Sequence, residues 1–209
     1  MLLIGQFDSP FVRRVAIALH HYGFSYEHRP WSVWAQADEV AKYNPLRRVP
    51  ILVLDDQEVL IESGAILDAL DEMSADDRRL LPRTGPVRRA GLRVSALATG
   101  LADKAVSLLY ERVLRGDVLR SAVWTDRCQA QITATLELLE KQRAAAGGPF
   151  WFGTLSHADI AVACALRFAR EAHPALWREA AYPSLNAHAE RCEAMPLFKS
   201  AVQALHVAV

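Results

Sequence analysis

The sequence lacks a net charge, because 24 lysines and arginines balance 24 aspartates and glutamates over 209 residues. No field of one sign therefore favours nucleic acid, an anionic membrane or a polyanionic substrate as a partner. Long hydrophobic runs are also absent, and no stretch approaches the roughly 18 apolar residues that a membrane span requires. We expect neither a nucleic-acid partner nor a membrane-spanning segment.

Cysteine is scarce, and the three cysteines lie far apart, at positions 128, 164 and 192. There is no CxxC motif, and an odd number of cysteines cannot pair completely within one chain. Free and mostly buried thiols are typical of a reducing compartment. The N-terminus has no basic segment, and its apolar run is short, which indicates no signal peptide. These features predict a cytoplasmic protein.

Familiar catalytic motifs are missing as well, including the Walker A loop, GxGxxG, HExxH and GxSxG. The seven histidines do not fall at metal-ligand spacings, so no metal site is predicted. The pair His20-His21 is expected at the polar end of a helix. The arginine pairs Arg13-Arg14 and Arg88-Arg89 are expected on solvated helix faces.

Apolar residues are plentiful, at 52% of the chain, and charged residues make up 23%. A chain of this length buries roughly 70% of its unfolded surface and needs no disulfide to fold. Its pattern changes near residue 80, where a stretch with charges, two prolines and a glycine indicates a linker. We predict two domains, residues 1–76 and 87–209, joined by a linker at 77–86.

The first domain alternates short apolar runs with helical patterns. Ser9-Pro10 indicates a helix start, with serine as N-cap and proline at the first helical position, and Gly23 suits the helix end. The order of elements is βαβ, a connection, ββ and α. Strands are expected at 2–4, 25–29, 50–54 and 58–61, and further helices at 36–43 and from Ser63 onward.

The second domain has helical periodicity almost throughout, with two long helices predicted at 87–115 and 118–146. Shorter helices are expected from Ser156, near Pro183 and after Pro196. Ser156 stands three residues before Asp159 and an apolar run follows, which is the pattern of a capping box. We interpret this box as structural and not chemical.

Three short motifs in the first domain stand out together: Ser9-Pro10-Phe11-Val12, Val49-Pro50 and Glu62-Ser63. Each alone has a structural explanation, as an N-cap, a strand start and an N-cap. Their order and spacing resemble the glutathione S-transferase family over the whole chain. The match includes Asn44-Pro45-Leu46-Arg47-Arg48-Val49-Pro50 and the Ser156/Asp159 box followed by Ile160-Ala161-Val162-Ala163.

The resemblance implies an N-terminal thioredoxin-like βαβ-ββα domain followed by an all-α helical-bundle domain. It implies glutathione as a substrate, with no other cofactor, and Ser9 as the catalytic residue. It also implies a glutathione site with a distinct role for each of six residues. Phe11 lines the thiol pocket, and Arg48 meets the glycyl carboxylate or a main-chain carbonyl. Pro50 is the cis-proline, and the main chain of Val49 pairs with the cysteinyl part. Glu62 binds the γ-glutamyl ammonium, and Ser63 receives the γ-glutamyl carboxylate.

The chemistry supports the role of Ser9, because the reacting species must be a thiolate. Lowering a thiol pKa by two to three units requires roughly 3–4 kcal/mol. A hydrogen bond to a charged group supplies about 1.5–3 kcal/mol. A helix N-terminus adds about 0.3–1 kcal/mol. Ser9 therefore acts as a hydrogen-bond donor, and no general base is needed.

Alternatives within the fold can be narrowed from the same residues. A glutaredoxin would carry Cys-Pro-x-Cys at the position of Ser9, and no cysteine precedes Cys128, which excludes dithiol chemistry at this helix. A tyrosine-type transferase would need a phenol where Phe7 stands. Two departures from the family pattern are Arg47-Arg48, in place of the commoner Gly-Lys, and Asp8, an anion beside the expected thiolate.

Two classes of function remain at this stage. The first is an enzyme that conjugates glutathione to a small electrophile, with peroxidase, dehalogenase or isomerase activity as possible additions. The second is a non-catalytic glutathione-transferase-like module for binding or protein interaction. The resemblance also implies a homodimer. The long helix from Val87 carries a wide stripe of small and apolar residues, which suits either such an interface or the core of the helical bundle.

Overall fold

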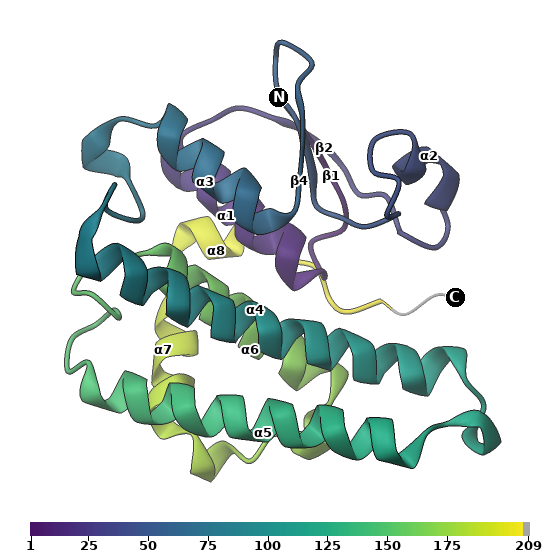
Figure 1. Ribbon diagram of the computed structural model, residues 1–209. Coiled ribbons are helices and arrows are strands. Elements are labelled where there is room, and N and C mark those ends of the chain that lie inside the picture. Colours follow the sequence, from purple (N-terminus) through teal and green to yellow (C-terminus); the bar gives the residue numbers. More distant parts are fainter. Residues whose placement is uncertain (207–209) are drawn as a thin grey trace. The chain divides into compact units, whose positions relative to one another are not determined.

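A computed structural model describes residues 1–206 of the chain, and it divides into two compact units (Figure 1). The first unit is Met1–Leu80 together with the segment that starts at Met195. The second unit is Leu81–Ala194. The domain limits expected from the sequence, at 76 and 87, stay a prediction.

The first unit holds a four-stranded mixed sheet in the order β2-β1-β3-β4. Strand β1 pairs in parallel with β2 and antiparallel with β3, and β3 pairs antiparallel with β4. Helices α1 and α3 pack against each other beside the sheet (Figure 1). This confirms the predicted thioredoxin-like arrangement. The elements are β1 (Leu2–Ile4), α1 (Pro10–Tyr22), β2 (Glu27–Arg29), α2 (Ala37–Ala41), β3 (Ile51–Val53), β4 (Val59–Ile61), α3 (Ser63–Met73) and α8 (Pro196–Lys199).

The sequence signals around α1 act as predicted. Ser9 is the N-cap, and its hydroxyl accepts a hydrogen bond from the Val12 N–H over 3.4 Å. Gly23 ends the helix in the left-handed region at φ 78°, a conformation that glycine adopts without a steric cost. Ile4, Ile51 and Val53 of the sheet form a buried cluster with Val40 of α2, and this cluster holds β1 against β3.

The second unit is all helical, as predicted. Helix α4 packs against α5 and α6, and α7 packs against α5 and α6. Helix α6 is buried on nearly every side, which explains its almost unbroken apolar sequence. None of the helices described, up to residue 206, has the length and apolarity to cross a membrane. The helices are α4 (Gly85–Leu114), α5 (Ala122–Ala145), α6 (His157–Ala172) and α7 (Pro183–Ala194).

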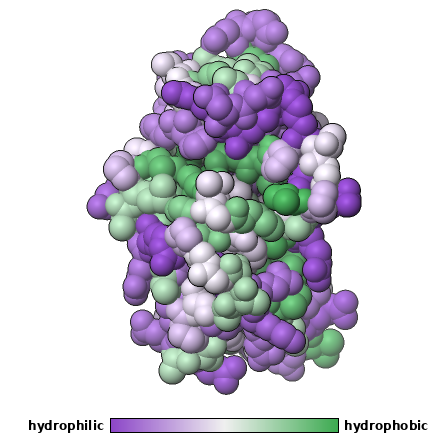
Figure 2. All heavy atoms as spheres, turned by 90° about the vertical axis from the view of Figure 1, so that its left-hand side faces the viewer, coloured by the Kyte–Doolittle hydropathy of each residue, from purple (hydrophilic) through white to green (hydrophobic). Residues whose placement is uncertain are grey.

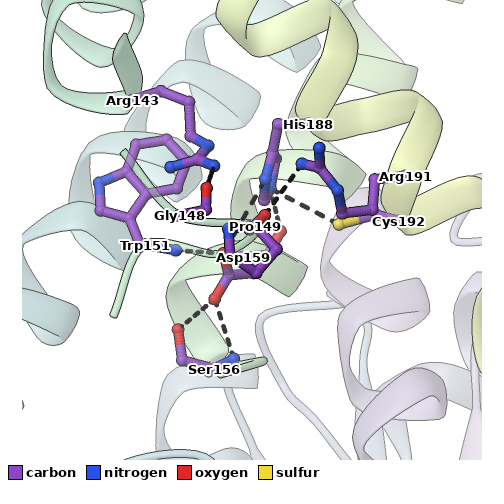
Figure 3. Close-up of polar contacts among 9 residues, drawn as sticks. All are labelled: Arg143, Gly148, Pro149, Trp151, Ser156, Asp159, His188, Arg191 and Cys192. Atoms are coloured by element: carbon purple, nitrogen blue, oxygen red, sulfur yellow. Dashed lines mark hydrogen bonds and ion pairs between the residues drawn. The ribbon is translucent and has the colours of Figure 1, made fainter. Parts of the chain in front are cut away.

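The capping box at the start of α6 is present (Figure 3). The Asp159 carboxylate is fully buried and accepts the Ser156 N–H at 2.9 Å and the Ser156 hydroxyl at 2.5 Å. Its other oxygen accepts the Trp151 N–H at 2.9 Å. Asp159 therefore joins the helix start to the preceding loop, which agrees with a structural role.

Two sequence expectations need correction. The second long helix begins at Ala122 and not at Val118, because Ser121 caps it by accepting the Trp124 N–H, and residues 117–119 form a separate 3-10 turn. The pair Arg13-Arg14 is buried, with exposed fractions of 2% and 5%, and does not lie on a solvated face.

The burial of Arg13 has a visible cause. Its Nε donates to the Ala201 carbonyl oxygen at 2.7 Å, and its Nη2 donates to the Phe198 carbonyl oxygen at 3.2 Å. The guanidinium also lies 5.8 Å from the centre of the Phe198 ring. These partners follow Arg13 by at least 185 residues, so no local pattern in the sequence reveals them.

Large hydrophobic side chains also remain exposed at several separate places, and the face shown in Figure 2 carries apolar atoms among hydrophilic ones. Scattered exposure of this kind is ordinary for a folded chain and by itself indicates no function.

Candidate active site

Ser9 lies at the junction between β1 and α1, directly before the first turn of the helix. Its hydroxyl oxygen accepts the Val12 N–H, so the hydroxyl proton can be donated to a group beyond the helix. The N-terminus of a helix also favours negative charge, through its unpaired N–H groups and the helix dipole. Ser9 is therefore suited to stabilise an anion.

The loop before β3 meets the start of α1 at Gly5, which sequence reasoning missed. Gly5 has φ 129°, and a Cβ built there would lie 2.5 Å from Val12 Cγ2 and 2.9 Å from Val49 Cβ. Only glycine permits this close approach. The Val49–Pro50 peptide bond is cis. The motifs at Ser9 and at Val49-Pro50 are thus neighbours in space, and a glycine directly after a strand was the available signal.

Asn44 holds the turn that leads to Val49, and it is the second residue, after Gly5, whose role the sequence did not reveal. Its side chain is buried, with Nδ2 donating to the Arg48 carbonyl oxygen at 2.9 Å and Oδ1 accepting the Leu46 N–H at 3.0 Å. Arg47 in the same turn has φ 52° and pairs with Asp38 at 3.1 Å. These contacts fix the turn. The side chain of Arg48, which lies in this turn, is about half exposed.

Glu62 and Ser63 stand at the start of α3, with Glu62 and not Ser63 as the N-cap. Glu62 has φ 66°, and its side chain makes no capping bond to the helix. Its carboxylate lies 4.0 Å from the Arg48 guanidinium. A Cβ at Gly64 would meet nothing within 4 Å, so there is open space beside this first turn. The N–H groups at the start of α3 can therefore receive an anion from a ligand.

Comparison with known proteins identifies the family. The models of the glutathione S-transferase N-terminal and C-terminal domains match residues 3–78 and 122–191. An uncharacterized glutathione S-transferase-like protein of Escherichia coli, YibF, is 30% identical over 80% of this chain and 81% of its own length. This chain belongs to the glutathione S-transferase family.

Solved structures of members of this family agree with this membership. A glutathione S-transferase from Methylobacterium radiotolerans, in complex with glutathione sulfonate, is 28% identical and has a TM-score of 0.92, over 100% of this chain and 97% of its own. A family member from Pseudomonas fluorescens Pf-5 with bound glutathione is 31% identical and has a TM-score of 0.86, over 96% and 97% of the two chains.

Within this transferase fold, Asp8 lies directly before Ser9 and is partly buried. Burial raises the pKa of its carboxyl group, and hydrogen bonds from the His206 and Ser9 main chains lower the pKa in part. The His206 N–H donates to Asp8 Oδ2 over 3.1 Å. Asp8, the anion expected beside the thiol site, is thus hydrogen-bonded to a residue that follows it by 198 positions.

Phe7 takes the place at which a tyrosine-type transferase would carry its phenol. Its ring stacks on the His28 ring with the centroids 3.9 Å apart and the planes 2° from parallel. His28 Nε2 in turn donates to the Gly5 carbonyl oxygen at 2.8 Å. Phe11 lies partly buried in the first turn of α1, and its place in a thiol pocket stays a prediction.

No metal centre accompanies these residues. Within residues 1–206, the structure brings together no group of three or more histidine, cysteine, aspartate or glutamate side chains that could hold a metal ion. The candidate site therefore consists of hydroxyl, main-chain, carboxylate and guanidinium groups.

Proposed function

We propose that this chain is a glutathione transferase that binds glutathione in its first unit and conjugates it to a small electrophile in the cytoplasm. Packing at Gly5 carries the proposal, because it sets the Ser9 helix start beside the Val49-Pro50 turn. The relatives solved with glutathione or glutathione sulfonate support glutathione as the ligand.

In the proposed complex, the charges of glutathione match the groups around it. Glu62 takes the γ-glutamyl ammonium, and Ser63 with the first N–H groups of α3 takes the γ-glutamyl carboxylate. The Val49 main chain pairs with the cysteinyl part, and Arg48 meets the glycyl carboxylate or a main-chain carbonyl. Pro50 and Phe11 border the thiol. This arrangement brings the sulfur toward the N-terminus of α1.

At that position, Ser9 donates a hydrogen bond to the thiolate. The free energy needed to lower the thiol pKa by two to three units is roughly 3–4 kcal/mol. The charged hydrogen bond and the helix N-terminus together supply about that amount. The thiolate then attacks the electrophilic centre, a carbon–sulfur bond forms, and the electron pair leaves with the departing group or stays on the acceptor.

The second candidate is a glutathione-transferase-like module that binds glutathione without catalysis. One observation favours it: the Asp8 carboxyl lies one residue from Ser9, and an anion there opposes formation of a thiolate. Retention of Ser9, Val49-Pro50 and Glu62-Ser63 favours the enzyme.

Binding to immobilised glutathione, followed by a conjugation assay with a generic electrophile, separates the two candidates. Retention with elution by free glutathione and measurable conjugation supports the enzyme. Retention without conjugation supports the binding module. A chain that flows through the column and conjugates nothing refutes both.

We also propose that the protein is a homodimer.

A further inference from the structure

The segment that follows α8, residues 200–206, is held against α1 by a buried side chain of that helix. Arg13 is 2% exposed and donates to the carbonyl oxygens of Phe198 and Ala201. These bonds fix the start of the segment beside α1, four residues after Ser9.

Beyond Ala201, the same segment makes two hydrogen bonds to the residues that precede Ser9. The Phe7 N–H donates to Gln203 Oε1 over 3.0 Å, across 196 residues of sequence. The His206 N–H donates to Asp8 Oδ2 over 3.1 Å, across 198 residues. One contact uses a side chain of the segment and the other uses its main chain, and they hold two consecutive residues.

We propose that Gln203 and the His206 main-chain N–H are positioning groups for Ser9, which fix the orientation of the Phe7–Ser9 loop in the proposed transferase reaction. The proposal rests on the function proposed above. The Ser9 main chain is fixed, because its carbonyl oxygen accepts the Arg13 N–H at 2.9 Å and its N–H donates to the Gln6 carbonyl oxygen at 3.2 Å. The Ser9 hydroxyl, in contrast, makes a long bond of 3.4 Å to the Val12 N–H, so the direction of the hydroxyl depends on the loop that carries it. A donor held in place before the reaction needs no reorganisation when charge develops on the sulfur.

The bond to Asp8 has a second consequence. Asp8 accepts hydrogen bonds from the main chains of His206 and Ser9, which hold its carboxylate in one place. Without the His206 N–H, this carboxylate can turn toward the bound sulfur. Two like charges disfavour ionisation of the thiol. Loss of that bond should therefore shift the pH profile of the reaction upward as well as slow it.

The test compares matched variants in steady-state conjugation with glutathione and a generic electrophile. Gln203→Met removes the acceptor and keeps the size, and Gln203→Glu keeps an acceptor. His206→Pro removes the N–H, and His206→Ala keeps it. Val202→Thr alters an exposed residue of the same segment and is the control, with wild-type kinetics expected.

We expect Gln203→Met and His206→Pro to lower kcat about tenfold, the scale of one hydrogen bond, with the KM for glutathione within about twofold. Gln203→Glu and His206→Ala should recover most of that loss. The alkaline shift of the kcat profile should appear in His206→Pro and not in His206→Ala. Wild-type kcat and pH profile in both Gln203→Met and His206→Pro would overturn the proposal, as would equal losses in the members of each pair.

Amide hydrogen exchange separates this proposal from the proposed function. If the wild-type chain does not conjugate glutathione, the transferase function fails, and exchange at Phe7, Asp8 and Ser9 still reports the loop. We expect faster exchange there in Gln203→Met and His206→Pro than in Val202→Thr. Unchanged exchange at all three positions would show that the segment does not hold the loop.

Discussion

The guanidinium of Arg48 lies 4.0 Å from the carboxylate of Glu62, and both side chains are about half exposed. An ion pair in such an exposed place contributes little to stability. Its two charges are instead complementary to those of glutathione, which carries an ammonium group and two carboxylates. In the proposed complex, glutathione therefore replaces this weak pair with two contacts to the ligand, one for each side chain.

Replacement of Glu62 or Ser63 should weaken glutathione binding without unfolding the protein. We expect Glu62→Gln and Ser63→Ala each to cost about 1.5–3 kcal/mol of binding free energy, the scale of a charge-assisted hydrogen bond. Isothermal titration measures it, and Glu58→Gln, at an exposed position in the turn before β4, is the matched control. Wild-type affinity in both variants would remove the γ-glutamyl assignment.

Ser9→Ala should lower turnover and change glutathione affinity only modestly. The hydroxyl matters most once the sulfur is charged, so its loss should cost about 1.5–3 kcal/mol of activation, or roughly 10- to 150-fold in kcat. Ser9→Thr keeps both a hydroxyl and an N-cap and serves as the control. Kinetics are measured well below the unfolding temperature, because loss of the cap also destabilises α1. Unchanged turnover of Ser9→Ala from about pH 6 to pH 8 would make Ser9 a cap alone.

Elements whose signals lie within a few residues could be predicted from the sequence. The Ser9 cap, the Gly23 stop and the Ser156/Asp159 box all depend on spacings that the chain itself displays. The start of α5 was placed four residues too early, because residues 118–121 also fit a helical pattern and only the Ser121 cap decides the boundary.

Contacts between distant parts of the chain left no such signal. Arg13 looks like a surface residue until its carbonyl partners in the segment after Met195 are known. Gln203 and His206 stand in a short, mostly apolar stretch, Ala201-Val202-Gln203-Ala204-Leu205-His206, and their partners precede them by 196 and 198 residues. Sequence motifs therefore point to Ser9, Val49-Pro50 and Glu62-Ser63 but not to the contacts of Gln203 and His206, and the roles of these residues in the site stay predictions.

Asp159→Asn should destabilise the second unit and leave the chemistry of the site intact. Asp159 is fully buried and accepts three hydrogen bonds from Trp151 and Ser156. Loss of the cap and imperfect pairing of these donors should lower the free energy of unfolding by about 2–4 kcal/mol. Denaturant unfolding measures this, with the exposed Asp126→Asn as control. Normal stability with abolished activity would instead make Asp159 a functional residue.

The buried His188 should make stability fall in acid. Its Nε2 lies 3.3 Å from the Asp159 carbonyl oxygen and 3.6 Å from Cys192 Sγ (Figure 3), and burial lowers its pKa from 6.5 to about 4. In the unfolded chain, the His188 imidazole takes up a proton below about pH 6.5, while in the folded chain it stays neutral down to about pH 4. Protonation therefore favours the unfolded state in this window, and the free energy of unfolding falls by up to roughly 3 kcal/mol as the pH drops through it.

His188→Gln isolates this contribution, because other groups also titrate. Burial raises the pKa of the neighbouring Asp159 carboxyl, which acts in the opposite sense. The positive charges of Arg143 and Arg191 add to burial in lowering the pKa of His188. Unfolding free energies measured at about pH 6.5 and pH 4.5 should fall by about 2–3 kcal/mol more in the wild type than in the variant. Equal losses in the two proteins would show that His188 is not the group responsible.

The protein should be a homodimer in solution. Most of the apolar stripe of α4 that suggested a dimer is buried within the second unit, including Val94, Ala98 and Leu101, so those residues need no partner chain. A separate exposed line remains on α4 at Leu92, Ala96 and Gly100, which are spaced four residues apart and so lie on one face of the helix. The small residues Ala96 and Gly100 permit close approach of another surface.

Light scattering at low micromolar concentration should give about 46 kDa, twice the chain mass of 23.2 kDa, as a two-fold pair requires. Ala96→Glu places a charge in the middle of the exposed line and should shift the mass toward the monomer, whereas Glu137→Ala on α5 should leave the mass unchanged. If the wild-type chain is a monomer that still conjugates glutathione, the dimer is refuted and the transferase function stands. If it is a dimer that Ala96→Glu does not weaken, the interface lies away from this line of α4, because a buried and unpaired carboxylate at a contact surface costs several kcal/mol.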